Sequence, residues 1–279
     1  MDNIILNKLH SEMLIIYEEI ARICKKHNLT YFVVGGTLIG AVVHKGYIPW
    51  DDDLDIAMPR DDYDKFIELC PKETSDRFLL HHTTTDDNYW LPFAKLRLRN
   101  TVFLEEKRKN VDAPSGIYVD IFPFDYSDNH VTLWKKLSWR LMTWLNNYIN
   151  QKVTGSYKIG KSGKIVNIIF KCFSIKRLSL FRDNIMRSFD NGKREHFVDL
   201  AGGRVLENSY FQINKMIPVH EMPFENINVK VPAVPDYYLT ILYTKKYLVI
   251  PPEEDRKTHN PLYIRFEDGS EYDFRDANQ

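Results

Sequence analysis

Cysteine is scarce in this chain of 279 residues, which contains only Cys24, Cys70 and Cys172. Three widely spaced cysteines form neither a disulfide framework nor a Cys-x-x-Cys zinc motif, and they favour a reducing compartment. An excess of charge is also missing, since 38 Lys and Arg residues balance 38 Asp and Glu residues. This balance argues against a dedicated nucleic-acid-binding protein, in which basic residues predominate. We therefore expect a cytoplasmic protein with no nucleic-acid partner.

Long apolar runs and internal repeats are lacking as well. No window of about twenty uninterrupted apolar residues occurs, so the sequence predicts no membrane-spanning helix. The N-terminus lacks the basic residues that open a secretory signal peptide, and we expect none. A chain of this length can bury a substantial core, as one large domain or as two small ones.

Regular patterns predict a fold that mixes helices and strands. Apolar side chains recur every three or four residues in 3–28, which indicates an amphipathic helix. A second helix is predicted from Pro59, with Tyr63, Phe66 and Cys70 in its buried stripe. Residues 76–125 alternate apolar and polar side chains in short runs, which is typical of strands and hairpins. We therefore predict an α/β (α+β) fold.

The most informative stretch begins at residue 31. A short apolar strand, 31–34, breaks at Gly35 and Gly36, and adjacent glycines let a backbone turn tightly and approach a ligand. Residues 37–43 then predict a helical turn whose free N–H groups would face an anion. This arrangement indicates a site for a phosphate group.

Acidic residues follow this turn in the run 51–55. In a strand, residues i and i+2 share a face, so Asp53 and Asp55 would project together while Leu54 enters the core. Adjacent carboxylates repel one another unless a cation lies between them. Mg²⁺ suits such oxygen ligands and takes the rest of its shell from water and substrate phosphates, with Mn²⁺ as the alternative. The two acids that precede Asp53 fit a solvated loop equally well.

The residues around these carboxylates resemble a known family. Residues 36–42 (GTLIGAV) and 44–56 (HKGYIPWDDDLDI) are similar to the signature of the LicD family. That family comprises phosphotransferases of the nucleotidyltransferase fold, which move phosphocholine or a related alcohol phosphate from a CDP-linked donor to a cell-surface glycan. The resemblance has two departures, Val43 where Arg is usual and Thr244 where Gly is usual.

The resemblance implies a nucleotidyltransferase-like mixed sheet flanked by helices. It implies CDP-choline or another CDP-alcohol as donor, and a lipid-linked glycan or a teichoic acid precursor as acceptor. The acceptor would attack the phosphate nearer the alcohol and release CMP. Donor binding would then fall to Gly35, Gly36, Thr37 and Lys45.

A third carboxylate is predicted on the apolar run 118–125. Charged residues rarely lie in such a strand without a partner, and the run matches the family's strand that ends in Asp-Ile-Phe-Pro. By this resemblance Asp120 joins Asp53 and Asp55 as a metal ligand and catalytic residue, and it would act as general base. Asp125 fits a turn or a helix cap better.

Basic residues form the remaining candidates for the donor site. Lys95 and Arg97 would share a face of a strand, where they would grip phosphates or serve as ordinary surface cations. Arg256 and His259 resemble the family's closing pattern, in which a basic residue and a His follow a Pro-Pro pair. Each of them could equally be an unremarkable surface residue.

The segment 131–187 differs in composition from the rest of the chain. It holds twelve Lys and Arg residues and one acid, Asp183, and three of the five tryptophans. Such a segment suits a helix lying on anionic lipid at the inner face of the plasma membrane, or docking of another polyanion. The alternative is an ordinary helical insertion whose Trp134, Leu137, Leu141 and Tyr148 pack inward, with a flexible break at 155–163.

These observations divide the chain into three parts. Residues 1–130 would form the catalytic core, 131–187 a basic helical insertion, and 188–279 a part that completes the core and the cleft. Three other functions stay open. A nucleotidyltransferase would use an NTP and release pyrophosphate, a glycosyltransferase would use the Asp-x-Asp motif on a sugar nucleotide, and a membrane-associated binding protein would lack activity.

Overall fold

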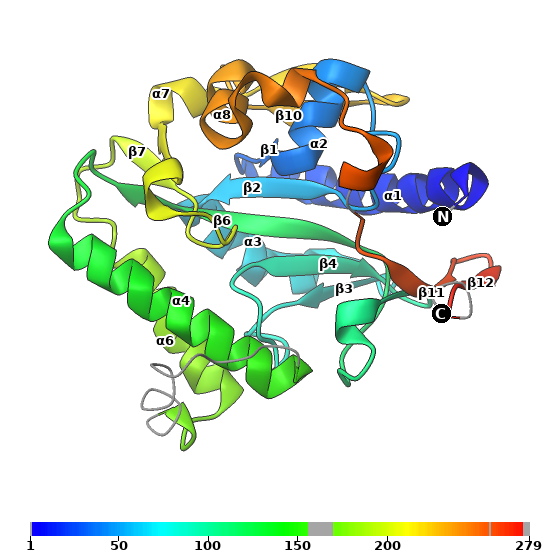
Figure 1. Cartoon of the computed structure of the whole chain (residues 1–279), viewed down its shortest axis with the longest axis horizontal. Coiled ribbons are helices and arrows are strands. Elements are labelled where there is room, and N and C mark those ends of the chain that lie inside the picture. The colour runs from blue at the N-terminus through cyan, green and yellow to red at the C-terminus, as the bar shows by residue number, and fades with distance from the viewer. Residues whose placement is uncertain (1, 156–169, 257, 276–279) are drawn as a thin grey trace.

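A mixed sheet forms the centre of the molecule, in a computed structural model that describes residues 2–155, 170–256 and 258–275 (Figure 1). The strand order is β1-β2-β6-β4-β3, and β7 and β8 continue from β6. The predicted α+β class is confirmed. The strands of this sheet are β1 Phe32–Val33, β2 Asp55–Pro59, β3 Phe78–His81, β4 Ala94–Leu98, β6 Tyr118–Ser127, β7 His196–Val198 and β8 Tyr210–Gln212.

Two amphipathic helices, α1 (Asn3–His27) and α3 (Arg60–Glu73), pack on the sheet. Asp2 caps α1 by accepting hydrogen bonds from the backbone N–H groups of Ile4 and Ile5 at 2.6 and 3.3 Å. The apolar stripes predicted from the periodicity are buried in both helices. Both predicted helices are therefore confirmed.

The strand register sets the position of the acidic residues. β2 and β6 run parallel, and Asp55 lies opposite Asp120. Leu54 is fully buried, as predicted. However, β2 begins at Asp55, so Asp53 lies in the preceding loop and not on the same strand. The backbone N–H of Asp55 donates to the hydroxyl of Thr37 at 2.9 Å and not to a carbonyl of a neighbouring strand. The regular strand pairing therefore stops at Asp55, and the residues before it form a loop.

Asp125 also differs from its prediction as a turn or cap residue. It lies within β6, and its carboxylate accepts two hydrogen bonds from Arg60, at 2.7 and 2.9 Å. Burial raises the pKa of Asp125, while the Arg60 guanidinium opposes that shift. A paired carboxylate of this kind can be accommodated inside a strand, where an unpaired one would be costly.

The remaining elements lie at the edges of the sheet. A hairpin, a three-stranded sheet and short helices come mainly from residues after 188, and β7 and β8 of that part pair with the central strands. Their bounds are β5 Val102–Glu105, β9 His220–Phe224, β10 Ile227–Val231, β11 Pro261–Arg265, β12 Glu271–Asp273, α7 Ile213–Met216, α8 Pro235–Tyr243, η2 Glu106–Arg108, η3 Leu206–Asn208, η4 Thr244–Leu248 and η5 Glu253–Asp255.

The basic segment forms a pair of helices, α4 (Leu133–Thr154) and α6 (Ile175–Arg187), beside the sheet (Figure 1). Tyr148 is buried, but Trp134 and Leu137 are 65% and 49% exposed, so their predicted inward packing is wrong. They face solvent because another side of α4, with Met142 and Leu145, packs in an apolar cluster that includes Leu178 of α6. Gly155 caps α4, and the rest of the predicted break lies outside the described residues.

Among the described residues, no helix combines the length and the apolar character that a bilayer crossing requires.

Candidate active site

The glycine turn and the acidic run fold against each other. The helix α2 (Gly35–Ile39) starts at Gly35, which has a φ of 59°, and continues as the π-helix η1 (Gly40–His44). A Cβ at Gly35 would lie 3.1 Å from the carboxylate of Asp55, and one at Gly36 would lie 2.5 Å from that of Asp51. The missing side chains therefore leave space for two carboxylates at the start of the helix.

Thr37 has an internal partner in this structure. It is 2% exposed, and its hydroxyl oxygen accepts the backbone N–H of Asp55 at 2.9 Å. Thr37 was expected to bind the donor; the observed bond shows that it positions the first residue of β2. Lys45 lies beyond the far end of η1, nine residues from Gly36, which corresponds to a separation on the order of 10 Å. The structure does not bring Lys45 to the glycine turn.

Asp120 and Lys95 form a buried ion pair beside Asp55. The Lys95 ammonium lies 2.5 Å from the carboxylate of Asp120 and 3.3 Å from the ring centre of Tyr118. Lys95 is only 1% exposed, and burial lowers its pKa to about 7, although Asp120 opposes the shift. Arg97 shares its face of β4, as predicted, but donates to the Gly116 carbonyl and to His81 in the interior.

Burial and the repulsion between neighbouring carboxylates both act on the acidic cluster. Burial raises the pKa of Asp51 to about 8 and that of Asp53 to about 6, and neighbouring carboxylates add to both shifts. Burial and the charges of Asp53 and Asp120 also raise the pKa of Asp55 well above its ordinary value. Within the described parts of the chain, however, no three His, Cys, Asp or Glu side chains are grouped as a ready metal site.

Asp52 is hydrogen-bonded to His259, a contact that the sequence did not reveal. It is 2% exposed and accepts hydrogen bonds from the backbone N–H and from Nδ1 of His259, both at 2.9 Å. The other ring nitrogen of His259 lies 3.7 Å from Asp53. Burial disfavours the charged imidazole, but the bond to Asp52 and the charge of Asp53 outweigh it and raise the pKa of His259 to about 9. His259 therefore belongs to the acidic cluster.

Arg256 lies near the same loop. Among the described residues it pairs with Glu253, and no contact links it to the carboxylates of the acidic cluster. Its guanidinium stacks on Trp50, with 4.4 Å between the guanidinium carbon and the ring centre, and donates to the Pro251 carbonyl at 3.3 Å. Trp50 immediately precedes the acidic run. Arg256 is thus held at the edge of the cluster.

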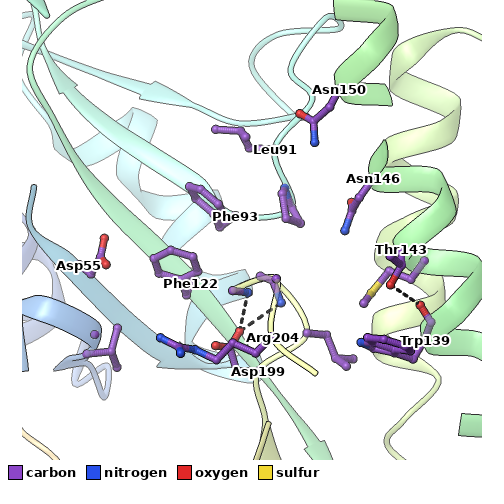
Figure 2. A pocket seen from close by; sticks show the side chains of 18 of the residues that line it. Asp55, Leu91, Phe93, Phe122, Trp139, Thr143, Asn146, Asn150, Asp199 and Arg204 are labelled. Carbon is purple, nitrogen blue, oxygen red and sulfur yellow. Dashed lines mark hydrogen bonds between the residues drawn. The ribbon is translucent and has the colours of Figure 1, made fainter. Parts of the chain in front are cut away.

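A cavity of about 450 Å³ adjoins Asp55 and Gly35 (Figure 2). One wall carries the rings of Phe93 and Phe122, with centroids 4.3 Å apart. The opposite wall is α4, which contributes Trp139, Thr143, Met142, Asn146, Asn147 and Asn150. The cavity therefore lies between the central sheet and the basic segment.

The base of the cavity is a loop that begins at Asp199. This buried carboxylate accepts the backbone N–H groups of Ala201 and Gly202 at 3.1 and 2.8 Å. Arg204 lies beside it and donates to the hydroxyl of Tyr243 at 2.9 Å. The sequence analysis missed this loop, although an acid followed by the glycine pair 202–203 repeats the features that identified the first site.

Comparison with known proteins gives one family match and several relatives. Residues 28–154 match a family described as LicD/FKTN/FKRP, nucleotidyltransferase domain. The chain is 36% identical over 106 residues to the lipopolysaccharide cholinephosphotransferase LicD of Haemophilus influenzae, covering 37% of this chain and 38% of that protein. An uncharacterized protein of Rickettsia typhi is 33% identical over 101 residues, covering 36% of this chain and 30% of that protein. The chain thus spans less than two fifths of the length of these relatives.

Proposed function

Because residues 28–154 match a family described as LicD/FKTN/FKRP, nucleotidyltransferase domain, we propose that this chain is a phosphotransferase acting on a CDP-linked alcohol phosphate. The transferred group is phosphocholine or a related alcohol phosphate. The acceptor is a hydroxyl of a cell-surface glycan or of a teichoic acid precursor, and CMP is released. The observation that carries the proposal is the parallel register of Asp55 with Asp120, beside a glycine turn and a cavity.

We propose that Asp53 and Asp55 hold Mg²⁺ or Mn²⁺, with Asp120 as a third ligand. The mutual repulsion of these partly buried carboxylates supports a cation site, because a cation would remove it. Two carboxylates are sufficient, since Mg²⁺ commonly completes its shell with water and substrate phosphates. When bound, the ion would neutralise charge on the transferred phosphate.

The protein's own residues supply the remaining functions in this proposal. Asp120 accepts the proton of the acceptor hydroxyl as general base. Lys95 holds that carboxylate in place through the buried ion pair. His259, kept protonated at neutral pH by Asp52, faces Asp53 and places a positive charge beside the incoming phosphates. Phosphoryl transfer depends mainly on such positioning and charge neutralisation.

We also propose that the protein contacts an anionic membrane at the cytoplasmic face, where lipid-linked acceptors would be reached. The solvent side of α4 supports this, since Leu133, Trp134, Leu137 and Trp144 are between 48% and 73% exposed. Exposed tryptophan and leucine beside basic residues are typical of helices that lie on anionic lipid.

A thermal-shift panel tests the proposed function without an acceptor. It compares CDP-choline, CDP-ribitol, CDP-glycerol, CTP and UDP-glucose, each with and without Mg²⁺. A ligand present at 100 times its Kd adds roughly 2.7 kcal/mol of stability, which raises Tm by several degrees. We expect one CDP-alcohol to stabilise the wild type only with Mg²⁺, and to lose this effect in Asp55→Asn. The exposed Asp76→Asn is the matched control and should respond as the wild type does.

Other responses would identify other functions. Stabilisation by CTP alone, with pyrophosphate as product, would indicate a nucleotidyltransferase. A shift with UDP-glucose alone would indicate a glycosyltransferase. Binding that needs no metal and survives Asp55→Asn would indicate an inactive binding protein.

A further inference from the structure

One side of α4 faces the cavity and carries a stripe of polar and aromatic residues. Trp139, Thr143, Asn146 and Asn150 recur every three or four residues and point into the cavity in Figure 2. Asn147 lines it as well, and all five side chains are partly exposed. Trp139 also packs on neighbouring apolar residues, and the Thr143 hydroxyl donates to the Trp139 carbonyl at 2.9 Å, so Asn147 and Asn150 are the members of the stripe that packing does not explain.

Asn146 is held in a fixed orientation by the buried Arg182 of α6. The guanidinium donates to the Asn146 side-chain oxygen at 3.0 Å, and to the carbonyls of Trp90 and Leu91 at 2.6 and 2.7 Å. Since Arg182 occupies the oxygen, the NH₂ group of Asn146 remains as a donor. The structure thereby presents a positioned hydrogen-bond donor beside the cavity.

The side-chain amides of Asn147 and Asn150 have hydrogen-bonding groups that a ligand could use. Within the described residues, no side-chain hydrogen bond involves Asn147 or Asn150. Across the cavity lie the rings of Phe93 and Phe122, and Trp139 adds an aromatic face on the α4 side (Figure 2). Amides satisfy hydroxyl groups, and aromatic faces cover apolar surfaces, so the two walls together suit a group with both characters.

The charges around the cavity argue against a polyphosphate. Asp55 and Asp199 contribute two carboxylates, against one basic side chain among the lining residues, Arg204, which donates to Tyr243. Lys95 and His259, the cations of the acidic cluster, do not line the cavity. An anionic nucleotide would therefore be drawn to the His259 side of Asp55, which leaves the α4 side for an uncharged group.

We propose that the α4 stripe is the acceptor subsite, where an uncharged sugar unit stacks on Trp139. Its hydroxyl groups form hydrogen bonds with the side-chain amides of Asn146, Asn147 and Asn150. This inference rests on the proposed function, because it assigns the acceptor of that same reaction. A sugar held there would extend along the cavity toward Asp55, where one hydroxyl reaches the reacting phosphate. The three amides would then select which sugar is modified.

Saturation-transfer NMR with a panel of methyl glycosides of hexoses and N-acetylhexosamines tests the subsite directly. We expect at least one glycoside to bind the wild type, with roughly tenfold weaker binding in the Asn147→Leu, Asn150→Leu double variant. Gln151→Leu is the matched control, because it lies on the same helix but does not line the cavity. Thermal melts of all variants establish that each is folded.

Adding CDP-choline to the bound glycoside completes the test. Retention of the glycoside signal supports the proposal, whereas its displacement would assign the cavity to the donor and overturn it. Absence of any glycoside binding, or equal binding by the double variant, would overturn it too. The thermal shift with CDP-alcohols in the same samples reports separately on the proposed function, so the two can fail independently.

Discussion

At the scale of single residues, Gly35 combines a left-handed backbone with close approach to a carboxylate. Its φ is 59°, and a Cβ would lie 3.1 Å from Asp55. Gly155 has a similar φ of 69°, but a Cβ there would meet nothing within 4 Å. Comparing substitutions at the two glycines therefore distinguishes the cost of backbone strain, which both share, from the cost of crowding Asp55, which arises only at Gly35.

We expect Gly35→Ala and Gly155→Ala each to lose about 1 kcal/mol of stability from backbone strain. Only Gly35→Ala should also lose transferase activity, because its methyl group would displace the Asp55 carboxylate. Urea unfolding measures the first effect and CMP release the second. Equal activity in the two variants would contradict a catalytic role for the space above Gly35.

The bond between Asp52 and His259 leads to a prediction about pH. His259 has a folded pKa of about 9 against an ordinary value of 6.5, so its contribution to stability is complete below pH 6.5 and is lost as pH rises through 9. We expect Asp52→Asn to move the pKa of His259 back toward 6.5 and to lower transfer at neutral pH. NMR titration of the His259 ring in the two proteins measures the shift. An unchanged pKa would show that the other carboxylates near it, Asp53 and Glu105, keep His259 protonated without Asp52.

The sequence identified some of these residues for a clear physical reason. Asp55 and Asp120 stand out because carboxylates within apolar strands need a partner. Asp52 was missed because three adjacent acids look alike in sequence, and its partner lies 207 positions away. The burial of Lys95 and Arg97 was missed because their internal partners, Asp120 and His81, come from other strands.

At the scale of elements, one ion pair fastens α4 to the sheet. Lys135, in the first turn of α4, is buried and donates to Asp128 and, at 2.7 Å, to the hydroxyl of Ser127. The hydrogen bond from Lys135 lowers the pKa of Asp128 from 3.8 to about 2. The end of β6 and the start of α4 are therefore linked through a carboxylate that must stay ionised.

We expect this link to weaken in acid. A carboxyl whose folded pKa is depressed adds stability above its unfolded pKa and loses it as pH falls from about 4 through 2. After allowance for solvent screening, the contribution is on the order of 1 kcal/mol. Unfolding of wild type and Asp128→Asn, compared across this range, measures it. A constant difference between the two proteins at every pH would refute the link.

Helical periodicity predicted α1 and α3 well but described α4 only in part. α1 and α3 each bury one stripe, which is the pattern that periodicity detects. α4 instead has three sides, which pack on the core at Leu145, line the cavity at Asn146 and face solvent at Trp144. Periodicity alone could not distinguish the apolar residues of α4 that pack on the core from those that face solvent, because that distinction requires the tertiary structure.

At the scale of the whole molecule, the exposed side of α4 is the surface we expect to contact membrane. Leu133, Leu137 and Trp144 recur at helical spacing with the exposed Lys136 and Arg140 between them. Each basic residue near an anionic bilayer adds about 1 kcal/mol of attraction, and salt screens it. Apolar contact and charge should therefore act together on this surface.

Sedimentation with phosphatidylglycerol-containing vesicles measures this contact. We expect binding at low salt, weaker binding at high salt, and roughly tenfold weaker binding for Trp134→Ser with Leu137→Ser, since burying the two side chains contributes more than 1 kcal/mol. Val205→Ser is the matched control, because Val205 is 53% exposed and lies outside α4. Wild type that stays in the supernatant at low salt would refute membrane contact. Binding that the double variant retains would shift it to another surface, of which the exposed run Leu248–Ile250 is the first to test.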